Sequence, residues 1–229
     1  MASSHEHDET ALEEFRCRLY LISPPRFDDL EGFAAVFESA LQGGDVACFQ
    51  LRLKNTDDAG ILAASERLMP IAHAHDVAFL INDRPDLAKK AGADGVHVGQ
   101  EDMPYVTARA VMGDDAIVGV TCHDSRHLAM AAGEAGADYV AFGAFFDTST
   151  KVAKAQATVE TLKWWADLME VPAVAIGGIT PSNCRPLVEA GADFLAVANG
   201  VWGYSDGAAE AVRRFNAIFD EIAPLRAHD

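Results

Sequence analysis

The sequence lacks several features that define large classes of proteins. It has no run of about 18 apolar residues, so no membrane-spanning helix is expected. Basic residues are scarce: 18 Lys and Arg stand against 35 Asp and Glu among 229 residues, a formal net charge of −17. Phosphate backbones and anionic membranes need a basic footprint, so neither a nucleic acid nor a membrane is expected as a partner. A small phosphorylated ligand remains compatible, because one pocket can be locally basic.

Cysteines are few and scattered. Cys17, Cys48, Cys122 and Cys184 form no CxxC pair, so the sequence indicates neither a metal clip nor a disulfide framework. Residues 1–16 are acidic and lack the apolar centre of a signal peptide. We therefore expect a cytoplasmic protein in which residues 1–16 form a flexible acidic leader and residues 17–229 form a single domain.

Short apolar runs alternate with longer amphipathic segments along this domain. The runs are nearly continuous in apolar residues, which is typical of strands covered on both faces of a parallel sheet. Strands are expected at Leu19–Ile22, Cys48–Leu53, Ala78–Ile81, Gly95–Val98, Ile117–Thr121, Tyr139–Phe142, Ala173–Ile176 and Phe194–Ala198. Helices are expected at Leu30–Leu41, Ala59–Ala74, Asp86–Ala91, Val106–Val111, His127–Ala135, Val159–Leu168, Ser182–Ala190 and Ala208–Ile222.

Eight strand–helix alternations favour an α/β fold, a single-domain (β/α)8 TIM barrel. The alternative is an open doubly wound sheet. That fold commonly carries GxGxxG after its first strand, where this chain has Ser23-Pro24-Pro25. A repeat also supports the barrel: Ala-Gly-Ala-Asp occurs at residues 91–94, 135–138 and 190–193, each time between a predicted helix and strand. We interpret it as helix-to-strand loop structure at the bottom of the barrel, with glycine closing each helix.

Active sites of such barrels lie at the carboxyl ends of the strands, so the residues that end each strand are the candidates. Alternation along the second strand places Gln50, Arg52 and Lys54 on one face, and Leu51 and Leu53 on the other. Two cations and an amide would then face the barrel mouth. The alternative is a surface pair of basic residues. Inward-facing charges are costly unless they meet a charged partner, which favours an anionic ligand.

Carboxylates follow the next two strands. The third strand leads into Asn82 and Asp83, and the fourth leads into Asp102. Like charges on adjacent strand ends repel unless a cation joins them. Mg²⁺ held by these carboxylates and by substrate phosphate oxygens would satisfy both groups. The alternative is that Asp83 or Asp102 caps the helix that follows it.

Glycines and hydroxyls follow the last strands. Thr148-Ser149-Thr150-Lys151 could bind an oxyanion, and Gly177-Gly178 and Ala198-Asn199-Gly200 follow the seventh and eighth strands. Loops at these two places often bind phosphate through backbone N–H groups, although a plain glycine turn is the alternative. Two anion sites indicate two phosphorylated substrates, or one phosphorylated at both ends. The metal side suits a diphosphate leaving group.

In this order on one barrel, the motifs resemble the thiamine phosphate synthase (thiamine-phosphate pyrophosphorylase) family, from about Arg18 to Ile218. The matching stretches are Gln50–Lys54, Ile81–Arg84, Gly95–Asp102, Gly119–His123, Thr148–Lys151 and Ile176–Thr180. The resemblance implies that hydroxymethylpyrimidine diphosphate joins a thiazole phosphate, or its carboxylated form, to give thiamine phosphate and pyrophosphate. It also implies a dissociative mechanism, in which diphosphate leaves before the thiazole nitrogen attacks.

The family's roles are carried over by position. The substrate-binding positions match Gln50, Arg52, Lys54, Asn82, Thr121, Thr148, Thr150, Lys151, Gly178, Ala198 and Asn199. The resemblance implies catalytic roles for Lys151, Arg52 and Lys54 around the diphosphate. It implies another for Thr121, which stands where the family has a serine that contacts the pyrimidine.

Asp83 and Asp102 match the family's Mg²⁺ carboxylates. The departures from the family pattern are Leu53, Ala144, Asp147 and Asn199. Leu53 replaces a glutamate and should be tolerated, because it is expected to face away from the mouth. Asp147 replaces a proline and adds negative charge near an anion site, which would weaken anion binding.

Two alternatives remain from the sequence. A thiazole tautomerase, a related barrel, would use His123 as its acid and base but has little need for the metal and diphosphate residues. A non-catalytic sensor of thiamine precursors need not keep both metal carboxylates. All three hypotheses expect small-molecule partners, and a homo-oligomer is compatible with the sequence. Pyrophosphate release would separate the synthase from both alternatives.

Overall fold

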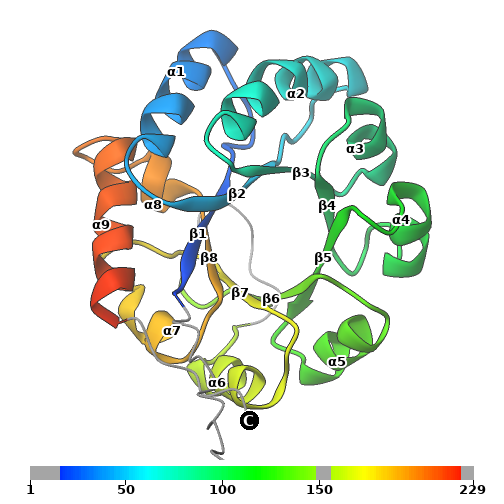
Figure 1. Cartoon of the computed structure of the whole chain (residues 1–229), viewed down its shortest axis with the longest axis vertical. Coiled ribbons are helices and arrows are strands. Elements are labelled where there is room, and N and C mark those ends of the chain that lie inside the picture. The colour runs from blue at the N-terminus through cyan, green and yellow to red at the C-terminus, as the bar shows by residue number, and fades with distance from the viewer. Residues whose placement is uncertain (1–15, 148–155, 223–229) are drawn as a thin grey trace, which may run out of the picture.

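Eight parallel strands close into a barrel in the computed structural model, which describes residues 16–147 and 156–222. They pair in sequence order, and the eighth pairs with the first (Figure 1). Their bounds are Arg18–Ile22 (β1), Val46–Leu51 (β2), Ala78–Asn82 (β3), Gly95–Val98 (β4), Ile117–His123 (β5), Tyr139–Gly143 (β6), Ala173–Ile176 (β7) and Phe194–Val197 (β8). The expected (β/α)8 barrel is confirmed, and the doubly wound sheet is wrong.

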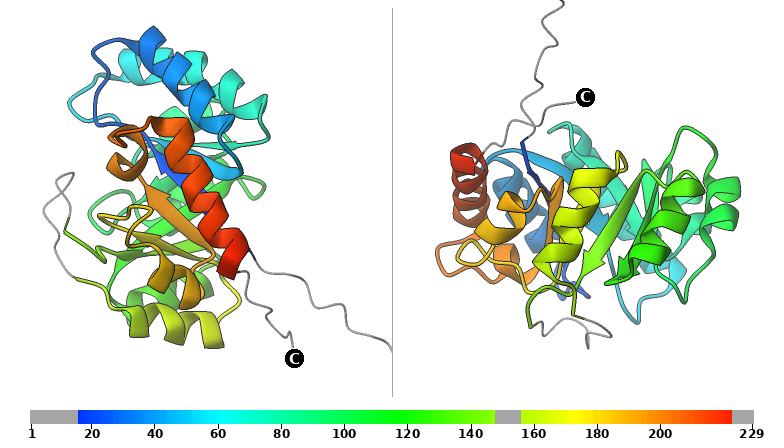
Figure 2. Two further views of the ribbon diagram at one scale, coloured as in Figure 1. Left: turned by 90° about the vertical axis from the view of Figure 1, so that its left-hand side faces the viewer. Right: turned by 90° about the horizontal axis from the view of Figure 1, so that it is seen from below.

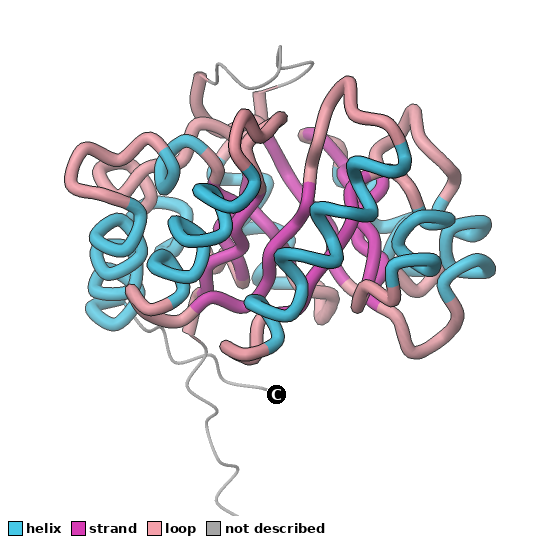
Figure 3. Tube along the Cα trace, turned by 90° about the horizontal axis from the view of Figure 1, so that it is seen from above, coloured by secondary structure: helices cyan, strands magenta, loops and turns pink. Residues whose placement is uncertain are grey.

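Helices surround the barrel on the outside, and loops lie at its two ends (Figure 3). They are Leu30–Leu41 (α1), Asp58–His73 (α2), Pro85–Ala91 (α3), Tyr105–Met112 (α4), Arg126–Glu134 (α5), Val159–Leu168 (α6), Arg185–Glu189 (α7), Asn199–Trp202 (α8) and Ala208–Ile222 (α9). Helix α9 crosses the outside of the barrel beside β1 and α1 (Figure 2). None of the helices within the described ranges is long and apolar enough to cross a membrane.

Most element boundaries shift by one or two residues from expectation, and three differences have a structural reason. Strand β2 ends at Leu51 rather than Leu53, because the next backbone N–H bonds a side chain of another loop instead of a strand. Helix α7 begins at Arg185 rather than Ser182, since the preceding residues form a turn. Helix α8 was not expected at all; at four residues it is too short to show helical periodicity.

The apolar residues form two layers. The larger core lies between the strands and the helices, and a smaller cluster fills the barrel interior around Tyr20, Leu80 and Tyr139. Gly119 of β5 makes room for one of these rings: a Cβ there would lie 1.9 Å from Cζ of Tyr139. The Tyr139 ring of β6 therefore fits in the barrel interior because residue 119 of the neighbouring β5 has no side chain.

The repeated aspartates lie at the amino-terminal end of the barrel. Asp94, Asp138 and Asp193 each accept a backbone N–H near the start of the preceding strand, β3, β5 and β7 in turn, at 2.6 Å. Asp45, which precedes β2, instead binds the guanidinium of Arg18 in β1 at 2.7 and 2.8 Å. The repeat is therefore loop structure at the bottom of the barrel, as interpreted from the sequence.

Of the expected leader, only Arg16 lies within the described residues. It contacts Asp45 and Asp220 at 3.1 and 2.7 Å. The four cysteines are buried free thiols.

Candidate active site

A cavity of about 590 Å³ opens at the carboxyl ends of the strands. It brings together residues from the ends of all eight strands, and ten of the predicted site residues line it. They are Gln50, Arg52, Lys54, Asn82, Asp83, Asp102, Thr121, Gly178, Ala198 and Asn199. Thr148, Thr150 and Lys151 lie outside the described residues. The predicted residues that the structure describes thus converge on one site.

The loop after β2 is held by the segment after β1. The backbone N–H of Arg52 donates to Oγ of Ser23 at 2.8 Å, and that of Lys54 donates to the carbonyl of Pro25 at 2.7 Å. Ser23 is fully buried, so the first of these contacts is shielded from water. Leu53 packs against the outer core, which confirms that it faces away from the cavity. These two hydrogen bonds between distant segments hold the residues after β2 in place. Arg52 and Lys54 therefore still face the cavity, and Leu53 still faces away from it, beyond the end of the strand.

Three charged groups meet where β3 and β4 end. Nζ of Lys54 lies 3.1 Å from Oδ2 of Asp83. Burial raises the pKa of Asp102, and the hydrogen bond and negative charge of the neighbouring Asp83 raise it further. Burial also lowers the pKa of the Arg52 guanidinium, although the charge of Asp83 opposes this. This corner holds carboxylates that a further cation would stabilise and a desolvated guanidinium that an anion would stabilise.

The helix-capping alternative for the two aspartates is wrong. The residues at the N-caps of α3 and α4 are Arg84 and Pro104, and neither helix has a side-chain cap. Asp102 instead accepts the N–H of Gly99 at 2.9 Å, which closes the turn after β4. This contact uses one oxygen of the carboxylate, Oδ2, and Asp102 also lines the cavity.

The donor set at this corner suits a hard divalent cation that keeps substrate and water oxygens as its other ligands. Among the described residues, no group of three or more His, Cys, Asp and Glu side chains is placed to hold a metal ion. Mg²⁺ usually takes one or two carboxylates and completes its shell with water and phosphate oxygens. Asp83 and Asp102 fit that requirement.

The loops after β7 and β8 form the opposite wall. Gly178 has φ 63°, and a Cβ there would lie 2.3 Å from the carbonyl oxygen of Asp147, so glycine is required. The side chain of Asn183 holds this loop, donating to the Gly178 carbonyl at 2.9 Å and accepting the N–H of Thr180 at 2.8 Å. Helix α8 begins directly after Ala198. A glycine loop and the first turn of a helix therefore face one cavity, and both offer backbone N–H groups.

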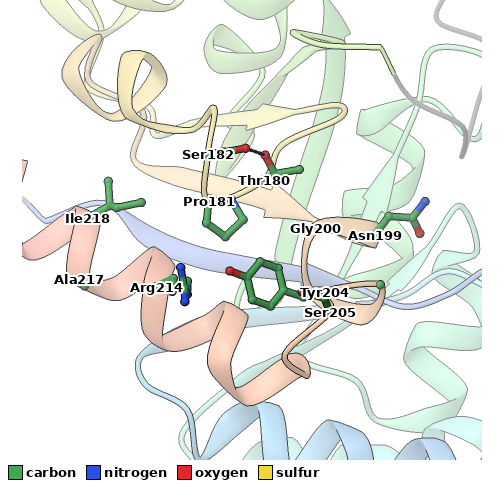
Figure 4. Close-up of a pocket in the computed structure, with 11 residues that line it drawn as sticks. Thr180, Pro181, Ser182, Asn199, Gly200, Tyr204, Ser205, Arg214, Ala217 and Ile218 are labelled. Carbon is green, nitrogen blue, oxygen red and sulfur yellow. Dashed lines mark hydrogen bonds between the residues drawn. The ribbon is translucent and has the colours of Figure 1, made fainter.

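A second cavity of about 540 Å³ lies behind this wall (Figure 4). It shares Thr180, Asn199 and Gly200 with the barrel cavity. The guanidinium of Arg214 in α9 faces it over the ring of Tyr204, 5.7 Å from the centroid, and is also ion-paired within α9. The loop after β7 and the start of α8 thus border both cavities.

Strand β5 contributes a polar edge that sequence reasoning identified only in part. Its register shifts between Thr121 and His123, and both residues line the cavity while Cys122 is buried in the outer core. Oγ1 of Thr121 lies 2.7 Å from Nε2 of His97, and the Thr121 carbonyl accepts from Gln100 at 2.7 Å. His97 was not among the predicted site residues. A polar residue between valines in an inward-facing position of β4 was the signal available for it.

Fold and site define a (β/α)8-barrel enzyme whose site lies at the carboxyl ends of the strands. The sequence model of the thiamine monophosphate synthase family matches residues 19–201. The chain belongs to this family.

Several relatives and a solved structure agree with this assignment. A thiamine-phosphate synthase of Rhodospirillum centenum is 63% identical, over 88% of this chain and 97% of its own length. One from Hyphomonas neptunium is 52% identical, over 94% and 99%. The structure of thiamine phosphate pyrophosphorylase from Pyrococcus furiosus superimposes with a TM-score of 0.79 at 30% identity, covering 92% of this chain and 99% of that one.

Proposed function

We propose that this chain is a thiamine-phosphate synthase, a transferase that joins hydroxymethylpyrimidine diphosphate to thiazole phosphate, or its carboxylated form, and releases pyrophosphate. One observation carries the proposal: a single cavity of a member of this family gathers the cations Arg52 and Lys54 beside the carboxylates Asp83 and Asp102. A tautomerase has little use for that corner, and a sensor need not keep both carboxylates.

The diphosphate end of the pyrimidine substrate is assigned to the ends of β2 and β3. Arg52 and Lys54 supply positive charge, and the amides of Gln50 and Asn82 supply hydrogen bonds. The two cations share the cavity with four described carboxylates, Asp83, Glu101, Asp102 and Asp147. This excess of negative charge would repel a diphosphate unless a metal cation accompanied it. The balance of charge supports a magnesium requirement.

Asp83 and Asp102 would hold the Mg²⁺. Bound there, the ion would act as a Lewis acid for the oxygens of the departing diphosphate. The chain's own part is to fix the two carboxylates: Lys54 contacts Asp83, and the turn at Gly99 holds Asp102.

The thiazole phosphate is assigned to the opposite wall, at Gly178, Ala198 and Asn199, together with Thr148 and Thr150. This division places the nucleophile's phosphate across the cavity from the leaving group. Backbone N–H groups suit a phosphate that is bound but does not react.

The chemical step that suits this arrangement is dissociative substitution. Charge grows on the diphosphate as the C–O bond breaks, and Arg52, Lys54 and Lys151 are assigned to stabilise it. The pyrimidine-methyl cation left behind is then captured by the thiazole nitrogen. Thr121 is assigned to orient the pyrimidine ring.

A pyrophosphate-release assay with both substrates, with and without Mg²⁺, tests this function. We expect release only when both substrates and Mg²⁺ are present. Isomerisation of the carboxylated thiazole phosphate without pyrophosphate release would favour the tautomerase. Binding of both substrates with no turnover would favour the sensor.

We place this reaction in the cytoplasm, which agrees with the four buried free thiols of the described chain. The small-molecule substrates are the partners that the cavity supports. Assembly into a homo-oligomer is a separate matter, to be measured by light scattering.

A further inference from the structure

A chain of hydrogen-bonded side chains crosses the barrel interior beneath the cavity. Nε2 of Gln50 donates to the Tyr20 hydroxyl at 2.8 Å, and this hydroxyl lies 2.9 Å from that of Tyr139. The Tyr139 hydroxyl lies 2.9 Å from Nδ1 of His97, whose Nε2 lies 2.7 Å from Oγ1 of Thr121. The first four side chains are at most 8% exposed. Gln50 and Thr121 both line the cavity, so the chain begins and ends at the site.

The amide of Gln50 sets the direction of donation along this chain. An amide nitrogen can only donate, so the Tyr20 oxygen accepts its proton. Tyr20 then donates its single proton to Tyr139, and Tyr139 donates its own to Nδ1 of His97. The imidazole proton consequently lies on Nε2 and is donated to Thr121, which leaves the Thr121 proton for the cavity.

Two conditions that this direction requires are met. Burial raises the pKa of the Tyr20 and Tyr139 hydroxyls well above the ordinary value, so both keep their protons at neutral pH. The thiol of Cys48 also lies beside the Tyr20 hydroxyl, but sulfur is a weaker acceptor than a phenolic oxygen. Hydrogen bonds that run in one direction also polarise one another.

We propose that His97 is a positioning residue for Thr121: it donates from Nε2 to Oγ1, so that the Thr121 hydroxyl donates its proton to an acceptor atom of the ligand. The ring nitrogens of a pyrimidine are acceptors of this kind, and in this respect the inference rests on the proposed function. Gln50 and Thr121 would then recognise the same ligand through one shared network.

The tautomer of His97 can be measured without any substrate. ¹⁵N NMR of the labelled full-length chain reports which ring nitrogen carries the proton, and the loss of one set of signals in His97→Gln assigns it among the eight histidines. We expect a protonated Nε2 and an unprotonated Nδ1 at neutral pH. A protonated Nδ1, or an average of both tautomers, would overturn the proposal.

Tyr139→Phe removes the donor to Nδ1 and keeps the ring. We expect a mixed tautomer and a KM for the pyrimidine diphosphate raised about 3- to 10-fold, as for one lost hydrogen bond, with the KM for thiazole phosphate unchanged. Tyr105→Phe is the matched control, because that hydroxyl bonds the Gly136 carbonyl outside the barrel. An unchanged tautomer, or an equal rise in both KM values, would contradict the proposal.

Side-chain replacements at His97 separate positioning from packing. Gln can still place an N–H near Thr121, whereas Leu cannot, so His97→Gln should keep more of the pyrimidine affinity than His97→Leu. In the Thr121→Val background, Tyr139→Phe should have no further effect on that KM. If Tyr139→Phe raises this KM equally with and without Thr121→Val, the proposal is wrong. If the wild-type chain releases no pyrophosphate, the proposed function fails, while the tautomer measurement still decides the inference.

Discussion

The ammonium of Lys54 lies 3.1 Å from Oδ2 of Asp83, and this contact joins the loop after β2 to the end of β3. The side chains are 45% and 28% exposed, so the pair contributes little to folding stability. Its significance lies in the cavity, where one group is assigned to the diphosphate and the other to the metal. A change of charge at either group alters the electrostatic environment of the other.

Asp102→Asn should abolish magnesium-dependent turnover and leave the fold intact. Asn keeps an acceptor for the Gly99 N–H but loses the charge that a metal requires. We expect pyrophosphate release to fall by about 100-fold or more. Because the pKa of Asp102 is raised in the folded chain, its ionised form costs stability above that pKa, and the cost disappears as the pH falls. The variant should thus unfold no earlier than the wild type at pH 7. Turnover that stays high without Mg²⁺ would disprove the metal assignment.

Ser23→Ala should weaken substrate binding without removing any group from the cavity lining. The Arg52 N–H loses its buried acceptor, so the loop after β2 becomes less well ordered. We expect the KM for the pyrimidine diphosphate to rise about 3- to 10-fold in steady-state assays. Ser65→Ala is the matched control, because its buried hydroxyl bonds the Ile61 carbonyl within α2. Equal effects of both variants on KM would count against this account.

Gly119→Ala should destabilise the barrel from the inside. The new Cβ would overlap the Tyr139 ring, so the ring must move, and overpacking of this kind costs about 1–3 kcal/mol. Gly133→Ala, in helix α5, is the control. Its Cβ would lie 3.5 Å from a methyl group of Val171, an ordinary contact, and alanine is more stable than glycine within a helix by about 0.5–1 kcal/mol. In urea unfolding, the free energy of unfolding should fall for Gly119→Ala and rise for Gly133→Ala. A neutral Gly119→Ala would show that the interior is loosely packed.

Asp45→Asn should reveal a pH-dependent contribution at the bottom of the barrel. The hydrogen bond with Arg18 lowers the pKa of Asp45, although burial opposes this. A lowered pKa gives stability that is fully present above the unfolded value near pH 4 and lost as the pH falls through the folded value. We expect the variant to be less stable by about 1 kcal/mol at pH 7 and equal to the wild type in acid. Thermal unfolding across pH 2–7 measures the difference, and turnover at pH 7 should not change.

Much of the barrel follows from local sequence. Apolar runs of strand length alternate with amphipathic segments, and this pattern predicted every strand to within two residues at either end. Because all strand ends of a parallel barrel meet at one face, the residues that follow each strand were predicted to converge. Ten of them do so.

The features that the sequence did not indicate depend on contacts between distant segments. Beyond Leu51, the inward and outward side chains keep alternating because Ser23 and Pro25 bond the backbone there. Nothing in the sequence near residue 52 indicates those two partners. The proposed role of His97 depends on the register of two other strands, β5 and β6, which places Thr121 and Tyr139 at its two nitrogens. Helix α8 has four residues, which is too short for a periodic pattern of its own.

Four aspartates at the bottom of the barrel join the strands in successive pairs, β1 with β2, β3 with β4, β5 with β6 and β7 with β8. We call each pair with its helices a quarter of the barrel. Asp45, Asp94, Asp138 and Asp193 tie the second strand of each quarter to the first. A circular permutant opened between quarters, before β3, β5 or β7, keeps all four ties, whereas one opened within a quarter separates the two halves of a tie in sequence. An exchange of whole quarters between related barrels would therefore keep each of these four contacts within one exchanged segment.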